Sequence, residues 1–285
     1  MDRSLSPTMR RKRLGAELRR LRKEATVSPE QAAEALDCAP SRIGHIETGR
    51  NSLRKPDLTV LLDLYDVSQE VREALEETRR EGARRGWWAT YRLPKSLQTY
   101  VGMEADAVRL RTVAVELIPG LLQTRAYARR THELATHLTS PDEVDLLAEA
   151  RMRRQQRLNE PEPLAVDAVI SEAALRRTCG EPGIAADQLR HLARLADLPN
   201  ITVRVVGLDD GLHPCMAGSI TVLHFDADVS LPVGYYEYAI GGHLIDDQNV
   251  VSKLDQLCDI MAERAASEEA SRQLIIELAE QAEGQ

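Results

Sequence analysis

The side chains best suited to metal or thiol chemistry gather between residues 207 and 243. His213, Cys215, His224 and His243 are residue types that ligate zinc, and Cys215 near His213 also has the makings of a thiol nucleophile with its base. None of them has the i, i+4 or C-x-x-C spacing that prearranges a metal site. A loop rich in Gly, Asp and Pro brings such residues together by chance, so we expect no metal site and no catalytic residue.

The standard motifs of nucleotide-binding and hydrolytic enzymes are absent from the sequence. It contains no G-x-x-x-x-G-K-[ST], no G-x-G-x-x-G, no H-E-x-x-H and no G-x-S-x-G. The cysteines Cys38, Cys179, Cys215 and Cys258 lie far apart, which predicts free thiols rather than disulfides. We therefore expect a protein that is not an enzyme and needs no cofactor.

A small-molecule site has better support in the same stretch. Residues 207–214 form a long turn, and the run Tyr235-Tyr236-Glu237-Tyr238 places aromatic rings and a carboxylate on a neighbouring strand, as ligand pockets often do. Alternation along a strand sends Tyr236 and Tyr238 to one face and Glu237 to the other. We favour a pocket on the Glu237 face, where His213 could add a polar group. The alternative is that the tyrosines simply cover the sheet.

Composition and charge indicate two domains of opposite sign. The chain has 285 residues, of which 43% are hydrophobic and 4% aromatic, so its cores must be largely aliphatic. Residues 1–55 hold 13 Lys and Arg against 7 Asp and Glu, whereas the remainder holds 24 against 38. A basic head on an acidic body is typical of a nucleic-acid-binding module joined to a larger domain. Without a long apolar segment or a signal pattern, we expect a cytoplasmic, nucleoid-associated protein with no membrane contact.

The head is predicted to consist of about five helices. Residues 1–9 read as a disordered lead-in, and residues 10–25 combine leucines at helical spacing with eight basic residues. Ser28 suits the N-cap of a second helix, and Pro29 suits its first helical position. We therefore expect five helices, at residues 10–25, 29–36, 40–49, 56–65 and 68–85. The DNA-binding domain therefore spans residues 10–85.

The body, residues 86–285, is predicted to be an α/β regulatory domain with a small sheet. Strands are expected at residues 164–170, 201–206, 219–225 and 233–238, and residues 113–118 suit either a strand or a helix. Helices are expected at residues 125–138, 142–158, 172–177, 184–196, 247–265 and 267–282. The fold class is thus mainly α with a smaller β part: an all-α head followed by an α/β domain.

The second and third expected helices carry a family resemblance. Ala33 is small enough for a close helix crossing, and Leu36 and Ile46 can fill the core beneath a short turn. With the segment SRIGHIETGR at residues 41–50, residues 10–66 strongly resemble the Xre/Cro/CI-type helix-turn-helix regulators. In that family the third helix lies in the major groove of double-stranded DNA.

The resemblance implies both DNA contacts and a structural ion pair. Arg42 would read guanine, while Arg50 would meet the phosphate backbone. The family's buried pair corresponds to Arg22 and Glu47. The DNA-binding candidates carried over are Ser41, Arg42, His45, Arg50, Asn51 and Arg22.

Some positions depart from the family pattern. Thr26 and Asp37 replace frequent turn glycines, Ala39 replaces a capping Ser or Thr, and Pro29 replaces a phosphate-contacting Gln. A lost cap costs about 1 kcal/mol, which the fold should survive. We expect modest DNA affinity, and the alternative is an interaction module with a helix-turn-helix shape.

The body has a resemblance of its own. Four motifs resemble the large domain of actinomycete helix-turn-helix regulators of the WhiJ-like, antitoxin-like group. They are ELIPGLLQT at residues 116–124 with Tyr127-Ala128, Arg151-x-x-Arg154-Gln155, Glu172-x-x-Leu175-Arg176, and LPNITV at residues 198–203. Such regulators are often encoded beside a small partner protein. The polar residues of these motifs and of the aromatic strand are our candidates for lining a ligand site: Glu104, Gln123, Arg154, Glu172, His213 and Glu237.

Two functions remain open from the sequence. The first is a sequence-specific transcriptional regulator, a homodimer whose body senses a small-molecule effector or a protein partner. The alternative is an antitoxin-like interaction protein that binds a small partner protein encoded nearby and autoregulates its operon.

Overall fold

A computed structural model describes residues 5–91, 93–134, 140–181, 183–227, 229–238 and 241–284 of the chain. It divides into two compact units, Met1–Ala89 and Thr90–Gln285, hereafter the N-terminal and C-terminal units. The three-residue-per-turn segment Trp87–Tyr91 lies at their boundary.

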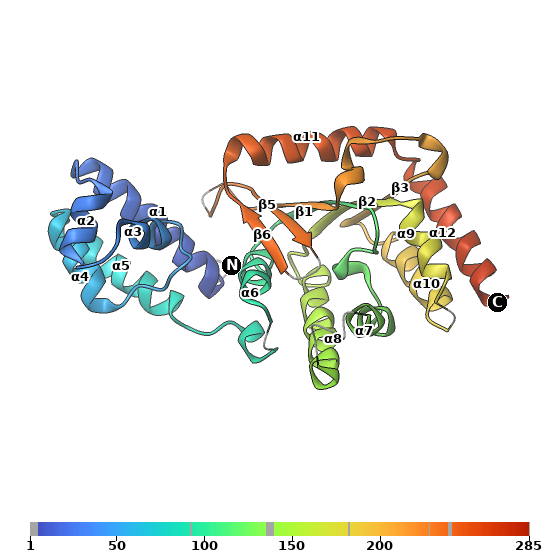
Figure 1. The fold of residues 1–285 in the computed structure, drawn as a ribbon, viewed down its shortest axis with the longest axis horizontal. Helices are drawn as coiled ribbons and strands as arrows, with labels where there is room; N and C mark the ends of the chain where they lie inside the picture. Colours follow the sequence, from blue (N-terminus) through green and yellow to red (C-terminus); the bar gives the residue numbers. More distant parts are fainter. Residues whose placement is uncertain are drawn as a thin grey trace. The chain divides into compact units, whose positions relative to one another are not determined.

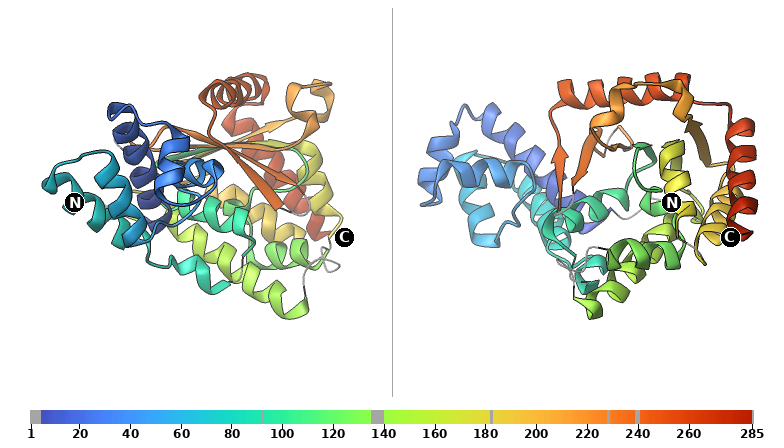
Figure 2. Two further views of the ribbon diagram at one scale, coloured as in Figure 1. Left: turned by 60° about the vertical axis from the view of Figure 1, so that its left-hand side comes forward. Right: turned by 45° about the vertical axis from the view of Figure 1, so that its right-hand side comes forward.

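The N-terminal unit consists of helices, as expected. They are α1 (Pro7–Glu24), α2 (Pro29–Ala35), α3 (Pro40–Glu47), α4 (Lys55–Leu64) and α5 (Gln69–Gly82), shown in blue to cyan in Figures 1 and 2. Leu18, Ile43, Leu58 and Leu61 are almost fully buried and belong to one core shared by the helices. The aliphatic pattern of the sequence is thus what packs this unit.

The expected disordered lead-in is wrong for the described residues 5–9. Helix α1 already begins at Pro7, because the hydroxyl of Ser6 accepts a hydrogen bond from the backbone N–H of Met9 at 3.2 Å. Met9 is fully buried, which fixes this first turn. A serine followed by proline is the same start signal that marks α2. Residues 1–4 lie outside the described residues.

The C-terminal unit is built on one mixed sheet of six strands in the order β3-β2-β1-β4-β5-β6. β1 pairs in parallel with β2, and β2 with β3, while the pairs from β1 to β6 through β4 and β5 are antiparallel. The strands are β1 (Arg109–Ala114), β2 (Ala165–Ser171), β3 (Ile201–Val206), β4 (Ile220–His224), β5 (Val233–Tyr238) and β6 (Gly241–Ile245).

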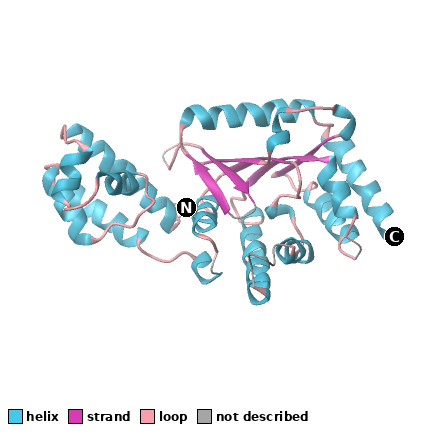
Figure 3. Cartoon of the chain, in the orientation of Figure 1, coloured by secondary structure: helices cyan, strands magenta, loops and turns pink. Residues whose placement is uncertain are grey.

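Helices cover both faces of this sheet (Figure 3). α11 (Gln248–Arg264) crosses one face, whereas α6 (Lys95–Glu104), α7 (Arg125–Glu133) and α8 (Pro141–Gln155) lie on the other (Figure 1). α9 (Glu172–Cys179), α10 (Ala185–Leu195) and α12 (Glu268–Glu283) pack together beside β2 and β3. The expected fold class, mainly α with a smaller β part, is therefore confirmed.

Three elements differ from the expectation. α6 and β6 were not expected, and β1 begins at Arg109, so the stretch from residue 113 is a strand only up to Ala114. β6 starts with two glycines and forms through the hairpin with β5, in which Tyr235 pairs with Leu244. Its own residues carry little strand signal. The expected helix over 125–138 is described to Glu133, and residues 135–139 lie outside the described residues.

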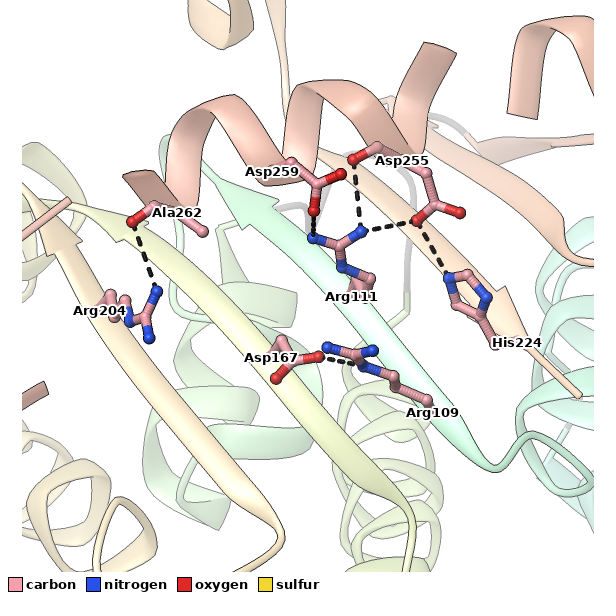
Figure 4. A network of polar contacts seen from close by, with 8 residues as sticks. All are labelled: Arg109, Arg111, Asp167, Arg204, His224, Asp255, Asp259 and Ala262. Carbon is pink, nitrogen blue, oxygen red and sulfur yellow. Dashed lines mark hydrogen bonds and ion pairs between the residues drawn. The ribbon is translucent and has the colours of Figure 1, made fainter. Parts of the chain in front are cut away.

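A polar network fastens α11 to its face of the sheet (Figure 4). Arg111 of β1 donates to Asp255 at 3.1 Å and to Asp259 at 2.5 Å, both on α11. His224 of β4 lies with Nε2 3.0 Å from the same Asp255 carboxylate. The side chains of β1 and β4 that face α11 are thus partly polar, and they set the position of that helix.

Candidate functional site

The turns of the helix-turn-helix use residues other than glycine in a left-handed conformation. Thr26 and Asp37, which stand at frequent turn-glycine positions, have φ values of 55° and 48°. Ser28 and Gln31 form a reciprocal capping box at the start of α2. Ala39 offers no side-chain cap to α3, as its type implied. The fold therefore tolerates these departures, at some cost in stability.

Arg22 and Glu47 form the expected ion pair between α1 and α3. Nε of Arg22 lies 2.5 Å from Oε1 of Glu47, and both side chains are 9% exposed. A third guanidinium nitrogen donates to the backbone carbonyl of Val27 at 2.9 Å. The hydrogen bonds that Arg22 donates to Glu47 raise the pKa of Arg22. Burial, and then the charge of Glu47, raise the pKa of Tyr65 to about 12. The guanidinium of Arg22 is therefore paired inside the N-terminal unit and is not available at the surface for a DNA contact.

The outward face of α3 is small and carries little charge. Ser41, Gly44 and His45 are exposed on it, and Arg50 and Asn51 are exposed directly after it. A Cβ placed on Gly44 would meet no atom within 4 Å. Such a flat helix face can approach the edges of base pairs closely.

Arg42, the expected guanine reader, forms an ion pair within the N-terminal unit. Its guanidinium donates to Asp57 of α4 at 2.5 Å, and the side chain is only partly exposed. Asp57 lies in the first turn of α4, where a carboxylate is favoured by the helix dipole. Because this carboxylate sits beside α3, Arg42 ties α3 to α4 instead of projecting freely from the surface.

Basic side chains surround the end of α3 nevertheless. Arg50, Arg54 and Lys55 are exposed in and just after the loop that leaves α3. On α1, the backbone of Lys12 lies so close to Gly49 that a Cβ there would be 2.6 Å from the Lys12 Cα. Gly49 has a φ of 70°, which favours glycine in any case. The loop therefore presents a positive edge suited to phosphate.

In the C-terminal unit, two of the ligand candidates form a buried ion pair. Arg154 of α8 donates to both carboxylate oxygens of Glu104 of α6, at 2.7 and 2.8 Å. Burial alone would lower the pKa of Arg154, but the charge and hydrogen bonds of Glu104 raise it. The guanidinium lies 5.4 Å from the ring centre of Tyr100, which stacks on Tyr235 with centroids 4.2 Å apart.

Gln123 holds a neighbouring arginine that the sequence reasoning did not select. Its amide oxygen accepts a hydrogen bond from Arg151 at 2.7 Å, while its amide nitrogen donates to the carbonyl of Ile118 at 2.7 Å. Gln155 donates to the backbone carbonyl of Gln123 at 2.5 Å. The turn at residues 118–124 is therefore fixed against α8, with Arg151 beside it.

Glu237 lies on the same face of the sheet as this arginine cluster. On β5, Gly234 and Tyr236 share the α11 face, since a Cβ on Gly234 would lie 2.6 Å from Leu254 of α11. Tyr235 and Glu237 therefore face α6 and α8. The Glu237 charge acts on the pKa of both Arg151 and Arg154, although it forms no ion pair with either in the described part of the chain.

The structure places the other two ligand candidates elsewhere. The loop of His213 packs on the α11 side, where Cys215 joins the core of Cys258 and Arg264 donates to the carbonyl of Leu212 at 3.1 Å. His213 is therefore not on the Glu237 face, contrary to our expectation. Glu172 pairs with Arg176 and accepts from the backbone N–H of Leu208 at 2.9 Å, so it anchors that loop.

Comparison with known protein families bears on both units. A family model described as a domain of unknown function (DUF5753) matches residues 97–277. The chain belongs to the DUF5753 family. A second model, described as a helix-turn-helix domain, matches residues 13–75, within the N-terminal unit. No curated protein and no solved structure matches the chain in the corresponding searches.

The helix-turn-helix match indicates DNA binding and transcription regulation, and it points to a regulator rather than an enzyme. The DUF5753 description itself assigns no activity. Among the described residues, no three His, Cys, Asp or Glu side chains are arranged to hold a metal ion. The described helices also include none that is long and apolar enough to cross a membrane.

In the DUF5753 domain, Arg151, Tyr100 and Tyr235 contact the candidates or each other but were not selected as site residues, although Arg151 and Tyr235 stood in the quoted motif and aromatic run. Arg151 had a usable signal, because it lies three residues before Arg154 and so on the same helix face. The stacking of Tyr100 on Tyr235 had none, since α6 was not expected and 135 residues separate the two tyrosines.

Proposed function

We propose that this DUF5753 protein is a sequence-specific transcriptional regulator of the Xre type, related to the WhiJ-like actinomycete group, which binds DNA as a homodimer. The observation that carries the proposal is the exposed face of α3 beside a positive loop. In the proposed complex, Ser41 and His45 meet base edges, and Arg50, Arg54 and Lys55 meet phosphates. Arg42 reads a base only after its ion pair with Asp57 breaks and its guanidinium turns to the DNA.

Selection of a binding sequence from random duplexes tests this proposal. The full chain should enrich one sequence with two half-sites about one helical turn apart. His45→Ala should then reduce the preference for the selected duplex over a scrambled one, because it removes a base-edge contact. Arg50→Gln should weaken binding to both duplexes, because it removes a phosphate contact.

A matched control for Arg50→Gln is Arg20→Gln. It removes the same charge from an exposed side chain whose guanidinium is already paired with Glu17 and Glu24 on α1. Arg20→Gln should leave both affinities unchanged. Failure of the full chain to enrich any sequence would contradict the proposal.

We further propose that the DUF5753 domain senses a small molecule, and that the buried arginine cluster is where it does so. The support is a polar, partly buried cluster with aromatic side chains, which is the composition of many ligand sites. The test is a thermal-shift screen of small-molecule fractions from the native cells against the full chain. A ligand at 100 times its Kd should stabilise the native state by about 2.7 kcal/mol.

An antitoxin-like role is the second candidate, and one surface feature favours it. Leu208, Leu212 and Met216 are exposed on the loop after β3, with Leu212 84% exposed. Exposed apolar side chains gathered on one loop suit a protein partner. If a small protein encoded beside this gene co-purifies with the full chain, the double variant Leu212→Ser/Met216→Ser should release it. Retention by the double variant would contradict this role for the loop.

A further inference from the structure

Two arginines on one face of α8 have different partners. Arg154 donates through Nε and one terminal nitrogen to both carboxylate oxygens of Glu104, whereas Arg151, one turn earlier, has no carboxylate within ion-pair distance among the described residues. The described hydrogen bond of Arg151 goes to a neutral group, the amide oxygen of Gln123. Arg151 is thus a partly buried cation whose charge the described side chains leave without a direct counter-ion.

Such an arrangement is costly for a protein in the absence of a ligand. Desolvation, followed by the positive charge of Arg154, lowers the pKa of Arg151 to about 10. A desolvated charge without a counter-ion destabilises the folded state. A bound anion from outside the chain would supply the counter-ion and so stabilise it. Arg151 as a whole residue retains partial exposure to solvent.

A second unpartnered group lies nearby. Nε2 of His132, on α7, is buried and has no hydrogen-bond partner among the described residues. Burial, and then the charges of Arg151 and Arg154, lower the pKa of His132 to about 4. An anion near His132 and Arg151 would relieve both groups, since it accepts from the guanidinium and offsets the positive charges that add to the effect of burial on the imidazole.

The backbone leaves room at the edge of the guanidinium. Gly120 stands beside it, and a Cβ on that residue would lie 3.4 Å from Nε of Arg151 and 3.5 Å from the nearer terminal nitrogen of Arg154. The missing side chain of Gly120 thus leaves a space about the size of a methyl group beside Nε of Arg151.

We propose that Arg151 and His132, with Gln123 positioning Arg151, form the anion-binding end of a small-molecule site in the DUF5753 domain, and that the ligand carries a carboxylate. The proposal rests on the sensing function proposed above and names the class of its ligand. With Glu237 counted, the charges of Arg151, Arg154, Glu104 and Glu237 sum to zero, so a monoanion adds only one negative charge there. A phosphate dianion would add a surplus negative charge close to Glu104 and Glu237. The planar guanidinium also matches a carboxylate bidentately.

Calorimetric titration of the full chain with acetate, benzoate and inorganic phosphate tests this assignment, with chloride keeping the ionic strength constant. The wild type should bind the two carboxylates in preference to phosphate. Arg151→Gln should bind them about tenfold to a hundredfold more weakly, because a hydrogen bond to a charged group is lost. Arg153→Gln is the control, since it removes the same charge from an exposed neighbour on α8 and should bind carboxylate like the wild type.

The melting temperature without added carboxylate separates a ligand site from a structural role. Arg151→Gln should melt at the same temperature as the wild type or higher, because the uncompensated charge is gone. In addition, benzoate should raise the pKa of His132, followed by NMR, in the wild type and not in Arg151→Gln. Arg151→Lys keeps the charge without the planar fork and should bind benzoate with intermediate affinity.

Three results would overturn the assignment: no difference between benzoate and chloride in the wild type, full benzoate binding by Arg151→Gln, or a preference for phosphate over both carboxylates. A marked drop in the melting temperature of Arg151→Gln would also overturn it, as this would assign Arg151 a structural role. These outcomes do not depend on DNA. Loss of the DNA-binding proposal would instead appear in the duplex selection, with carboxylate binding intact.

Discussion

Single residues in this protein divide into those that hold the fold and those left for a partner. Glu104 and Arg154 belong to the first kind, because each satisfies the other in the interior of the DUF5753 domain. Glu104→Gln should therefore destabilise the full chain by about 3 to 5 kcal/mol, since it leaves the Arg154 charge buried and unpaired. Urea unfolding measures this loss. An unfolding free energy equal to that of the wild type would contradict the pairing.

At the same scale, the pair of Arg42 with Asp57 restrains DNA recognition. Asp57→Asn removes the carboxylate that holds Arg42 and one negative charge beside α3. Affinity for the selected duplex should rise, and Arg42→Ala should abolish that gain when the two changes are combined. Fluorescence anisotropy with the selected duplex measures both. Equal affinity of the wild type and Asp57→Asn would show that Arg42 does not reach the DNA even when it is released.

His132 gives the C-terminal unit a defined response to acid. Its pKa is about 4 in the folded state, owing to burial and then to Arg151 and Arg154, against 6.5 when exposed. The unfolded chain thus binds more protons between these values, so the stability is complete above pH 6.5 and falls as the pH drops towards 4. The contribution of His132 is about 1 to 3 kcal/mol. His132→Gln should flatten the pH dependence of the melting temperature in this window, and an unchanged slope would contradict it.

At the scale of elements, glycine positions control how closely helices approach. A Cβ on Gly15 of α1 would lie 2.4 Å from the carbonyl oxygen of Ile46 on α3, so only glycine permits this crossing. Gly15→Ala should destabilise the N-terminal unit by about 1 to 3 kcal/mol through overpacking. Gly44→Ala on α3 meets no atom and should raise the stability by about 0.5 to 1 kcal/mol. Thermal melts of both variants measure these changes in stability. A similar change in melting temperature for Gly15→Ala and Gly44→Ala would contradict the close crossing of α1 and α3.

Elements with strong local signals were predictable from the sequence. The strands at Ile201–Val206 and Val233–Tyr238 match the expected bounds, and α11 and α12 begin after the capping residues Asp247 and Ser267. β6 was not predictable, because its glycines form a strand only when β5 supplies the hydrogen bonds.

The candidate ligand site was predictable only in part, for a related reason. Glu104, Gln123 and Arg154 were selected through motifs and do lie together with Glu237 facing them. The sequence could not show that the loop of His213 turns towards α11, because this depends on the packing of Cys215 against a helix far along the chain. Nor could it show that Arg42 meets Asp57, which lies on the following helix.

For the whole molecule, we propose that the N-terminal unit binds DNA and that the C-terminal unit senses a ligand. Full-length chain should bind the selected duplex much more tightly than residues 1–89, because two half-sites require a dimer and we assign dimerisation to the C-terminal unit. Light scattering should give twice the monomer mass of 31.8 kDa for the full chain. A full chain that is monomeric and still binds the selected duplex with high affinity would contradict the assignment of dimerisation to the C-terminal unit.

The salt dependence of binding to the selected duplex tests the central claim most directly. Three basic side chains per head are assigned to phosphates, Arg50, Arg54 and Lys55. For a dimer, the logarithm of the binding constant should then fall against the logarithm of salt concentration with a slope of about −5, and Arg50→Gln should reduce that slope by about 2. A slope near zero, or one that Arg50→Gln leaves unchanged, would contradict recognition of DNA by the surface around α3.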